Sequence, residues 1–294
     1  MKIVITGGAG RLGPFIVRDI LQRGHEVLCL DTTEPAEKNC PSLAVDLRET
    51  DKLIKALEGA DAVIHLARRR FPYTSNGFDL ESGLWKYPDV AQDAERFGHN
   101  VTLTYNFLAA SVAAGVRKLI CGSSLAVYGL YYPCRPLAPE YLPVDEDHPL
   151  KPQDPYGLTK LVGENLCAAF AASRGIQIAS MRFSGIASAD QYPTLRKRQK
   201  EPLIRGTGAL WSFVDVRDAA VVCRLAVERD FSGHQAFNIC AGRTIMKEDT
   251  SELVSRYLPG VKFIKSGLVK NWCAYDSSKA ESMLGFRAVH LLED

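Results

Sequence analysis

The sequence predicts an α/β protein built on a doubly wound parallel sheet, with a smaller α/β lobe toward the C-terminus. Short β-rich apolar runs alternate with segments that carry apolar residues at helical spacing, which is typical of a parallel sheet with helices on both faces. A glycine-rich turn separates the first strand from the first helix. Two long insertions follow later strands, so we expect them at the carboxyl edge of the sheet, where ligands bind.

The alternation can be followed through the first 182 residues. The strand Lys2–Thr6 ends at a run of glycines, and the helix that follows it closes at Gly24. The pattern then predicts strands at residues 26–30, 42–45, 60–65, 118–121 and 176–181, and helices at residues 12–24, 52–57, 101–114 and 156–173. Beyond residue 182 the pattern is mixed. We therefore expect a nucleotide-binding domain at residues 1–182 and a smaller substrate-binding lobe at residues 183–294.

The first turn has the glycine spacing of a dinucleotide site, because residues 6–13 read TGGAGRLG. Gly7 permits the tight turn, Gly10 lets the backbone approach a pyrophosphate, and Gly13 allows close packing of helix on strand. Asp31 ends the next strand, where its carboxylate can accept hydrogen bonds from ribose hydroxyls and would repel a 2′-phosphate. The sequence therefore predicts a Rossmann-type domain that binds NAD in preference to NADP.

Tyr156 and Lys160 form a candidate hydride-transfer pair at the start of a predicted helix. Their i, i+4 spacing places both side chains on one helical face. A phenol is a poor base at neutral pH, since its unperturbed pKa is about 10. A neighbouring ammonium stabilises the phenolate, so the tyrosine can take a proton from a substrate hydroxyl while hydride leaves the carbinol carbon. Taken alone, such a pair is common on helix surfaces.

Serines strengthen the interpretation of that pair. Ser123 and Ser124 directly follow the strand predicted at residues 118–121, so they face the same edge of the sheet. Hydroxyls in this position can hydrogen-bond a substrate oxygen. Arg68, Arg69 and Arg70 open the first insertion at that edge and are candidates for a substrate carboxylate or the cofactor phosphates, although a solvated charge run would look the same.

Composition argues against several kinds of partner. The formal net charge of +2 gives no reason to expect nucleic acid or an anionic membrane. No stretch approaches the roughly 18 unbroken apolar residues that a membrane span needs. The eight cysteines form no CxxC pair, and the histidines have no metal-ligand spacing. We expect a cytoplasmic protein with reduced thiols, no bound metal and a small-molecule substrate.

Together these segments resemble the extended short-chain dehydrogenase/reductase family, also called the NAD-dependent epimerase/dehydratase family. The resemblance runs from residue 1 to residue 286. Besides the glycine turn, Ser123-Ser124 and the Tyr156/Lys160 pair, the matching motifs are Asp46-Leu47, residues 65–67 (HLA), Asn100 before a helix, residues 213–218 (FVDVRD), residues 278–280 (SKA) and residues 284–286 (LGF).

The resemblance implies a role for each matching residue. Tyr156 would be the acid/base, Lys160 would hold the nicotinamide ribose and tune Tyr156, and Ser124 would orient the reacting oxygen. The other contacts to NAD would come from Gly7, Gly10, Arg11, Leu12, Gly13, Asp31, Asp46, Leu47, Leu66, Ala67 and Asn100. The substrate would be contacted by Arg68, Ser124, Tyr128 and Ser184. Family members are often homodimers joined by paired helices, here those at residues 101–114 and 156–173.

Departures from the family pattern concern the substrate. Nucleotide-sugar members usually carry an asparagine soon after the strand at residues 176–181, and Gly185 stands at the nearest position here. They also commonly place an arginine against the diphosphate just before the segment that matches residues 213–218, where this chain has Trp211-Ser212. The resemblance is therefore closer to free-sugar and uronic acid dehydrogenases than to nucleotide-sugar epimerases.

Three functions remain open at this stage. The first is net oxidation of a hydroxyl on a free sugar, sugar acid or polyol by NAD. The second is epimerisation of a nucleotide sugar, with NAD reduced and reoxidised within one cycle. Dehydration ranks lower, because Leu125 and Ala126 follow the serines where a dehydratase would carry acids. The third is non-catalytic NAD sensing, which the retained Tyr156 and Lys160 disfavour.

Overall fold

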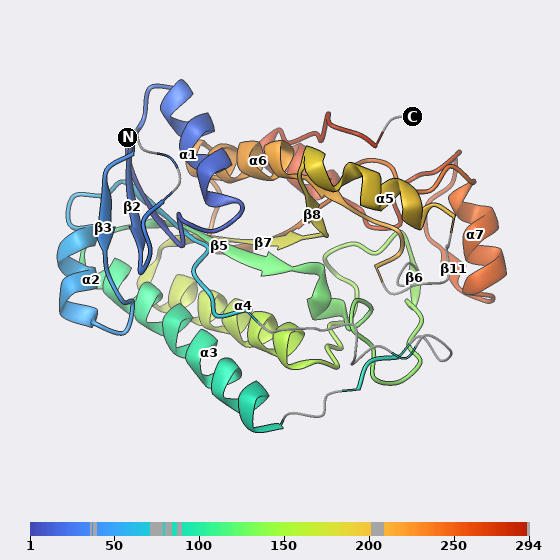
Figure 1. Ribbon diagram of the computed structural model, residues 1–294, viewed down its shortest axis with the longest axis horizontal. Helices are drawn as coiled ribbons and strands as arrows, with labels where there is room; N and C mark the ends of the chain where they lie inside the picture. Colours follow the sequence, from blue (N-terminus) through green and yellow to red (C-terminus); the bar gives the residue numbers. More distant parts are fainter. Residues whose placement is uncertain are drawn as a thin grey trace.

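The computed structural model describes residues 1–35, 37, 40–70, 79, 84–86, 90–200 and 209–292. At its centre lies a seven-stranded sheet with helices on both faces (Figure 1). All neighbouring strands of this sheet are parallel. In chain order its strands are β1 (Lys2–Thr6), β2 (Glu26–Asp31), β3 (Ser42–Ala44), β4 (Ala62–His65), β5 (Lys118–Ser124), β7 (Gln177–Phe183) and β10 (His234–Ile239).

The strand order confirms the doubly wound fold. Across the sheet the strands lie in the order β10-β7-β5-β4-β1-β2-β3. The chain moves outward from β1 through β2 to β3, then returns and moves the other way from β4. Because the direction reverses between β1 and β4, a crevice forms at their carboxyl ends, which is where such sheets bind ligands.

Helices cover the two faces as separate layers (Figure 1). α1 packs against α6 on one face, and α2, α3 and α4 lie on the other. The helices are α1 (Gly13–Gln22), α2 (Thr50–Leu57), α3 (Val90–Ala113), α4 (Pro155–Arg174), α5 (Tyr192–Arg198), α6 (Val216–Glu228), α7 (Thr250–Tyr257) and α8 (Ser278–Leu284), with short 3-10 helices η2 (Leu125–Tyr128) and η3 (Ala189–Gln191).

Two small sheets lie outside the main one. β6 (Tyr141–Leu142) pairs with β11 (Lys262–Phe263), and β8 (Ile186–Ala187) pairs with β9 (Val214–Asp215). Each joins segments distant in sequence. The part of the molecule outside the main sheet is therefore assembled from several separate stretches of chain.

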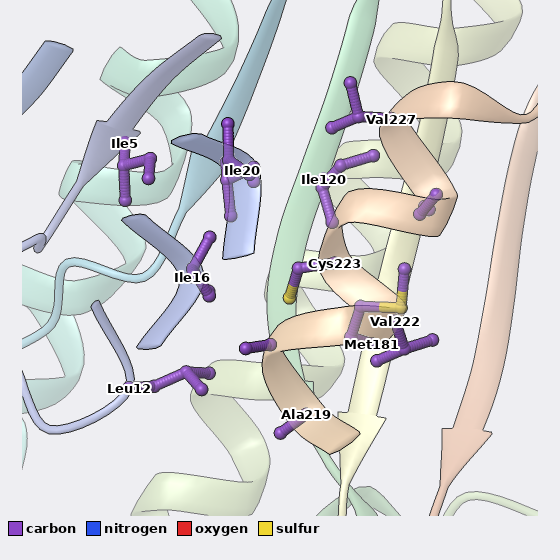
Figure 2. Close-up of a cluster of buried hydrophobic side chains, with 14 of the residues drawn as sticks. Ile5, Leu12, Ile16, Ile20, Ile120, Met181, Ala219, Val222, Cys223 and Val227 are labelled. Atoms are coloured by element: carbon purple, nitrogen blue, oxygen red, sulfur yellow. The ribbon is translucent and has the colours of Figure 1, made fainter. Parts of the chain in front are cut away.

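The core consists of three clusters of buried apolar side chains. The first fills the space between the main sheet and the α1/α6 layer, where Ile16 and Ile20 face Cys223 and Val227 (Figure 2). The second lies between the sheet and the layer of α2, α3 and α4. The third lies beside the sheet and includes Trp211, so the segments outside the main sheet have an apolar core of their own.

Two features differ from the expectations. α3 begins at Val90, so residues 90–98, expected as part of a loop, are helical. None of these nine residues is buried and Gly98 lies among them, so burial in the core imposes no apolar stripe that would mark the stretch as a helix. β10 lies in the main sheet although it follows residue 183, so the sheet crosses the expected domain boundary. In addition, no helix among the described residues is both long and apolar enough to span a bilayer.

Candidate active site

A cavity of about 910 Å³ opens at the carboxyl edge of the main sheet, and we call it the cofactor cavity. Gly7 after β1 and Leu66 after β4 both line it, so it lies at the point where the strand order reverses. The residues expected to bind cofactor or substrate that line it are Gly7, Gly10, Arg11, Leu12, Gly13, Asp31, Asp46, Leu47, Leu66, Ala67, Arg68, Ser124, Tyr156, Lys160 and Ser184.

The turn after β1 has the shape of a pyrophosphate cradle. Gly7 has a φ of +76°, and a Cβ there would lie 2.5 Å from the backbone nitrogen of Ala67. A Cβ on Gly13 would lie 2.1 Å from the carbonyl oxygen of Gly8, so only glycine lets α1 start this close to the turn. At Gly10 a Cβ would meet only the Gly7 carbonyl oxygen, at 3.1 Å. The backbone at the start of α1 is thus open to an anion, as NAD requires.

The acidic side of the cofactor cavity lies at the ends of β2 and β3. The Asp31 carboxylate accepts hydrogen bonds from the backbone N–H groups of Ala9, at 3.0 Å, and Thr32, at 2.7 Å. It therefore ties the end of β2 to the glycine turn while lining the cavity. Beyond β3, hydrogen bonds from Arg48 lower the pKa of Asp46 to about 2. Both carboxylates are suited to the adenosine half of NAD.

Tyr156 and Lys160 are positioned by the start of α4. The Asp154 side chain accepts the N–H of Gly157 at 2.9 Å, and Pro155 occupies the first helical position. Lys160 donates from Nζ to the carbonyl oxygen of Gly122 at 2.6 Å, and Nζ lies 5.8 Å from the centroid of the Tyr156 ring. Burial lowers the pKa of Lys160 to about 8, and the charge of Arg68 adds to the shift. The ammonium is thus fixed beside the phenol.

Both serines lie in the last two positions of β5, which extends three residues further than expected. Ser124 caps η2, with its Oγ accepting the N–H of Ala126 at 3.2 Å, and it lines the cofactor cavity. Ser123 donates from Oγ to Glu164 at 2.5 Å. Ser123 therefore links β5 to α4, and Ser124 lines the cofactor cavity.

A buried ion pair supports this end of the site. Arg182 on β7 donates to Glu164 on α4, with a closest distance of 2.8 Å, and both side chains are 5% exposed. Since Glu164 also accepts the Ser123 hydroxyl, one carboxylate joins β5, β7 and α4. The two elements that carry Ser124, Tyr156 and Lys160 are thus tied to each other and to β7 by a single fully paired group.

Two predicted site residues do not line the cofactor cavity. Tyr128 is 1% exposed, and its hydroxyl donates to Asn238 at 2.7 Å and accepts from Arg182 at 2.8 Å. Tyr128 packs in the third apolar cluster because η2 turns its ring inward. Asn100 is also buried, and its amide pairs with both backbone groups of Arg69, at 2.7 and 3.0 Å. It fixes the chain after β4 instead of lining the cavity.

Arg68 and Ser184 line the same cavity as Tyr156 and Lys160. The Cζ atom of Arg68 is 5.2 Å from the centroid of the Tyr156 ring. Ser184 directly follows β7, is 5% exposed, and its Oγ has no hydrogen-bond partner in the described part of the chain. Both line the cofactor cavity, so a cation and an available hydroxyl are offered beside the candidate acid/base.

Tyr131 and Tyr132 were not predicted to be site residues. Both line the cavity, and Tyr132 lies edge-on to Tyr156 with 6.3 Å between ring centroids. Trp85, from the first insertion, lies edge-on to Tyr132 with 5.4 Å between ring centroids. The backbone N–H of Trp85 donates to the carbonyl oxygen of Pro133 at 2.8 Å. The two long insertions thus meet beside the site. Their position after strands pointed to this edge, but no spacing identified the tyrosines.

Comparison with known proteins places the chain in a family. The family model described as "NAD dependent epimerase/dehydratase family" matches residues 3–81 and 85–240. A UDP-glucose 4-epimerase of Lactobacillus helveticus is 30% identical over 64% of this chain and 53% of its own length. An L-arabinose 1-dehydrogenase (NAD(P)(+)) of Haloferax volcanii is 28% identical over 71% of this chain and 76% of its own length. The match thus spans about half the length of the first of these relatives.

Solved structures agree with the family model. A short-chain dehydrogenase/reductase superfamily protein from Agrobacterium tumefaciens, crystallised with bound NAD, superimposes with a TM-score of 0.71 at 26% identity, covering 99% of this chain and 94% of that one. A UDP-glucose 4-epimerase from Bifidobacterium longum, in complex with NAD+ and UDP, gives a TM-score of 0.70 at 21% identity over 100% of this chain and 95% of that one, a likeness of fold alone. With the cradle, the acidic ribose side and the Tyr/Lys pair in one cavity, the chain belongs to the NAD-dependent epimerase/dehydratase family.

Proposed function

We propose that this chain is an oxidoreductase that uses NAD to oxidise a hydroxyl of a sugar or sugar acid. The observation that carries the proposal is that Ser124, Tyr156 and Lys160 line the same cavity as the glycine cradle. The cavity thus combines a place for the cofactor with the groups that hydroxyl oxidation needs.

In the proposed reaction Tyr156 takes the proton of the substrate hydroxyl. Lys160, anchored on the Gly122 carbonyl oxygen, stabilises the phenolate and holds the nicotinamide ribose. Ser124 donates its hydroxyl hydrogen to the reacting oxygen and keeps it within reach of Tyr156. Bound NAD supplies the acceptor for the hydride. The glycine cradle and Asp31 would hold its pyrophosphate and adenosine ribose.

The shape of the substrate side favours a substrate without a nucleotide diphosphate. The Tyr131 hydroxyl accepts the N–H of Gly185 at 3.0 Å and lies 3.1 Å from the Ser212 hydroxyl. Gly185 and Ser212 stand where nucleotide-sugar members usually carry the asparagine and the arginine for the diphosphate. The Tyr131 hydroxyl therefore hydrogen-bonds polar groups at both positions. This supports a substrate smaller than a nucleotide sugar.

A second candidate is epimerisation of a nucleotide sugar with an internal redox cycle. It is favoured by the name of the Lactobacillus helveticus relative, a UDP-glucose 4-epimerase. The L-arabinose 1-dehydrogenase relative supports net oxidation instead, and its match covers more of both chains. The two candidates differ in whether NADH leaves the enzyme.

The deciding experiment mixes the purified protein with NAD and a panel of free aldoses, uronic acids and polyols, and follows NADH absorbance. Net oxidation predicts a rise with one class of substrate. Silence across this panel, with interconversion of nucleotide sugars and no released NADH, would establish the second candidate.

The catalytic role is tested with Tyr156→Phe, which removes only the hydroxyl. We expect turnover to fall by about 10²- to 10⁴-fold, the usual contribution of a general acid/base. The dissociation constant for NAD should stay near that of the wild type, because Lys160 and the cradle are intact. Full turnover by this variant would refute the mechanism.

We also propose that the protein is a homodimer joined through α3 and α4. The two helices pack side by side on one face of the sheet. They leave large apolar side chains exposed on their outer surface, including Tyr105 at 51% and Leu158 at 40%. A second copy of the same helices would cover them.

A further inference from the structure

The catalytic end of the cofactor cavity carries two positive side chains against a single tyrosine. Arg68 Cζ lies 5.2 Å and Lys160 Nζ 5.8 Å from the centroid of the Tyr156 ring. Arg68 comes from the chain after β4, and Lys160 comes from α4. Burial is the main cause of the lowered pKa of Lys160, and the positive charge of Arg68 lowers it further.

No carboxylate lines this end of the cavity in the described part of the chain. The acidic residues that line the cavity are Asp31 and Asp46, which follow β2 and β3. β2 is three strand positions from β5, or roughly 14 Å at the usual strand spacing. Asp46 is moreover paired with Arg48 at 2.6 Å. These acids belong to the adenosine half and leave the positive charge at the catalytic end uncompensated.

The acids on α4 itself are already engaged. Asp154 is fully buried and caps the helix at Gly157, and Glu164 is paired with Arg182. Neither lines the cavity. Among the described residues, the Arg68 guanidinium makes no hydrogen bond or ion pair. It lies over the ring of Tyr156. It is therefore available to a ligand.

The same cavity also offers a hydrogen-bonding group without a partner. The Ser184 hydroxyl is buried, lines the cavity and has no partner within the described residues. A buried hydroxyl without a partner is costly, so a bound ligand that hydrogen-bonds it gains affinity. The pyrophosphate of NAD belongs at the glycine cradle, not beside Tyr156, so it does not explain the free guanidinium.

We infer that Arg68 and Ser184 form a subsite for a carboxylate group, and that the substrate is a hydroxy acid of the sugar-acid class. The inference rests on the proposed function for the identity of the reacting hydroxyl. A planar guanidinium matches a carboxylate in a bidentate arrangement, and charge complementarity selects an anion in a cavity that already holds Lys160. Ser184 donates to the same carboxylate or to a neighbouring hydroxyl of the acid.

Binding to the NADH-loaded protein tests the inference without any turnover, because reduced cofactor cannot oxidise an alcohol. Calorimetric titrations compare hexuronic and aldonic acids, each with its matched neutral sugar or alditol, and one sugar phosphate. We expect at least one acid to bind about 10-fold or more tightly than its neutral partner, the range of a charged hydrogen bond. The preference should weaken as salt is raised.

Three variants assign the preference. Arg68→Ala should abolish it, and Arg68→Lys should keep part of it, since an ammonium retains the charge without the fork. Arg174→Ala is the charge-matched control, because this exposed residue ends α4, about 27 Å along the helix from Tyr156. Ser184→Ala should weaken acid binding further, whether or not Arg68 is present.

The outcomes separate this inference from the proposed function. Equal binding of acids and neutral sugars, an unchanged preference in Arg68→Ala, or tighter Arg68-dependent binding of the sugar phosphate would overturn the carboxylate subsite. Neutral sugars oxidised as well as acids, with equal losses in Arg68→Ala, would show that Arg68 acts on Tyr156 instead. Arg68-dependent acid binding without NADH formation from any substrate would uphold the subsite and refute net oxidation.

Discussion

Asp31 shows how one carboxylate can both hold a turn and select a cofactor. It bonds the N–H of Ala9 in the glycine turn and faces the cofactor cavity. We predict that Asp31→Ala weakens NAD binding about 10-fold or more, the value of a charged hydrogen bond, and reduces the preference for NAD over NADP. Titrations with both cofactors measure this. Asp51→Ala, an exposed acid on α2, should change neither constant, and an unaltered NAD/NADP ratio in Asp31→Ala would contradict the assignment.

Lys160 makes stability depend on pH with a definite sign. Its pKa is about 8 in the folded protein, below the ordinary value of 10.5, so the unfolded chain holds the proton more tightly between these values. The cost of burying the ammonium is complete below pH 8 and disappears as the pH rises through 10.5. Replacing Lys160 with methionine removes that cost, so the gain in stability is largest at pH 7 and becomes smaller as the pH rises.

We therefore predict that the stability of Lys160→Met relative to the wild type falls by about 2–3 kcal/mol between pH 7 and pH 10. Denaturant unfolding of both proteins at each pH gives the difference. Lys52→Met, at an exposed site on α2, serves as the control and should show no such trend. A constant difference for Lys160→Met would mean that Lys160 is solvated.

At the residue scale, the sequence identified the groups whose spacing is dictated by a ligand or by a helix. The glycines of residues 6–13 and the Tyr156/Lys160 pair belong to this kind, and they line one cavity. Tyr128 was predicted to contact the substrate but does not line the cavity. The direction of its ring depends on the backbone of η2 and on Asn238, a partner distant in sequence. Tyr131 was missed because its role depends on Gly185 and Ser212, more than 50 residues later.

At the scale of elements, the pair Glu164–Arg182 joins β5, β7 and α4. We predict that Glu164→Gln destabilises the fold by about 3–5 kcal/mol, because it leaves the Arg182 charge buried without a counter-charge. Chemical denaturation measures the loss. Glu49→Gln, which breaks an exposed pair with Lys52, should cost under about 1 kcal/mol. A similar small cost at Glu164 would mean that water reaches the pair.

Strands and helices were predictable where burial imposes a period, and not elsewhere. The buried strands β1, β2, β4, β5 and β7 were located to within three residues because they form apolar runs between turns, whereas β6 was not predicted. The start of α3 was missed because none of residues 90–98 is buried, so no core-facing stripe is imposed on them. The place of β10 beside β7 was also missed, since 50 residues separate the two strands and no local pattern encodes such a pairing.

At the scale of the molecule, the site is built where the nucleotide-binding sheet meets the substrate side. The candidate catalytic side chains come from β5 and α4, while Tyr131, Tyr132 and Ser184 complete the lining of the cavity from segments beside the third apolar cluster. The sheet is shared with the family, but these segments differ from the nucleotide-sugar pattern. Substrate choice can therefore change without disturbing the sheet that positions the cofactor.

The outer face of α3 and α4 gives the last prediction, which concerns assembly. Tyr105 on α3 is half exposed and packs against the edge of Phe170 on α4, with 5.8 Å between ring centroids, so apolar rings from both helices meet on the face proposed for the dimer. Because a two-fold interface would bring Tyr105 close to the same region of its partner, Tyr105→Glu places like charges in a desolvated contact and should yield monomers in sedimentation experiments. Val269→Glu, at a site 68% exposed outside this face, should stay dimeric. A dimeric Tyr105→Glu protein would move the interface to another surface, and a monomeric wild type would refute the dimer.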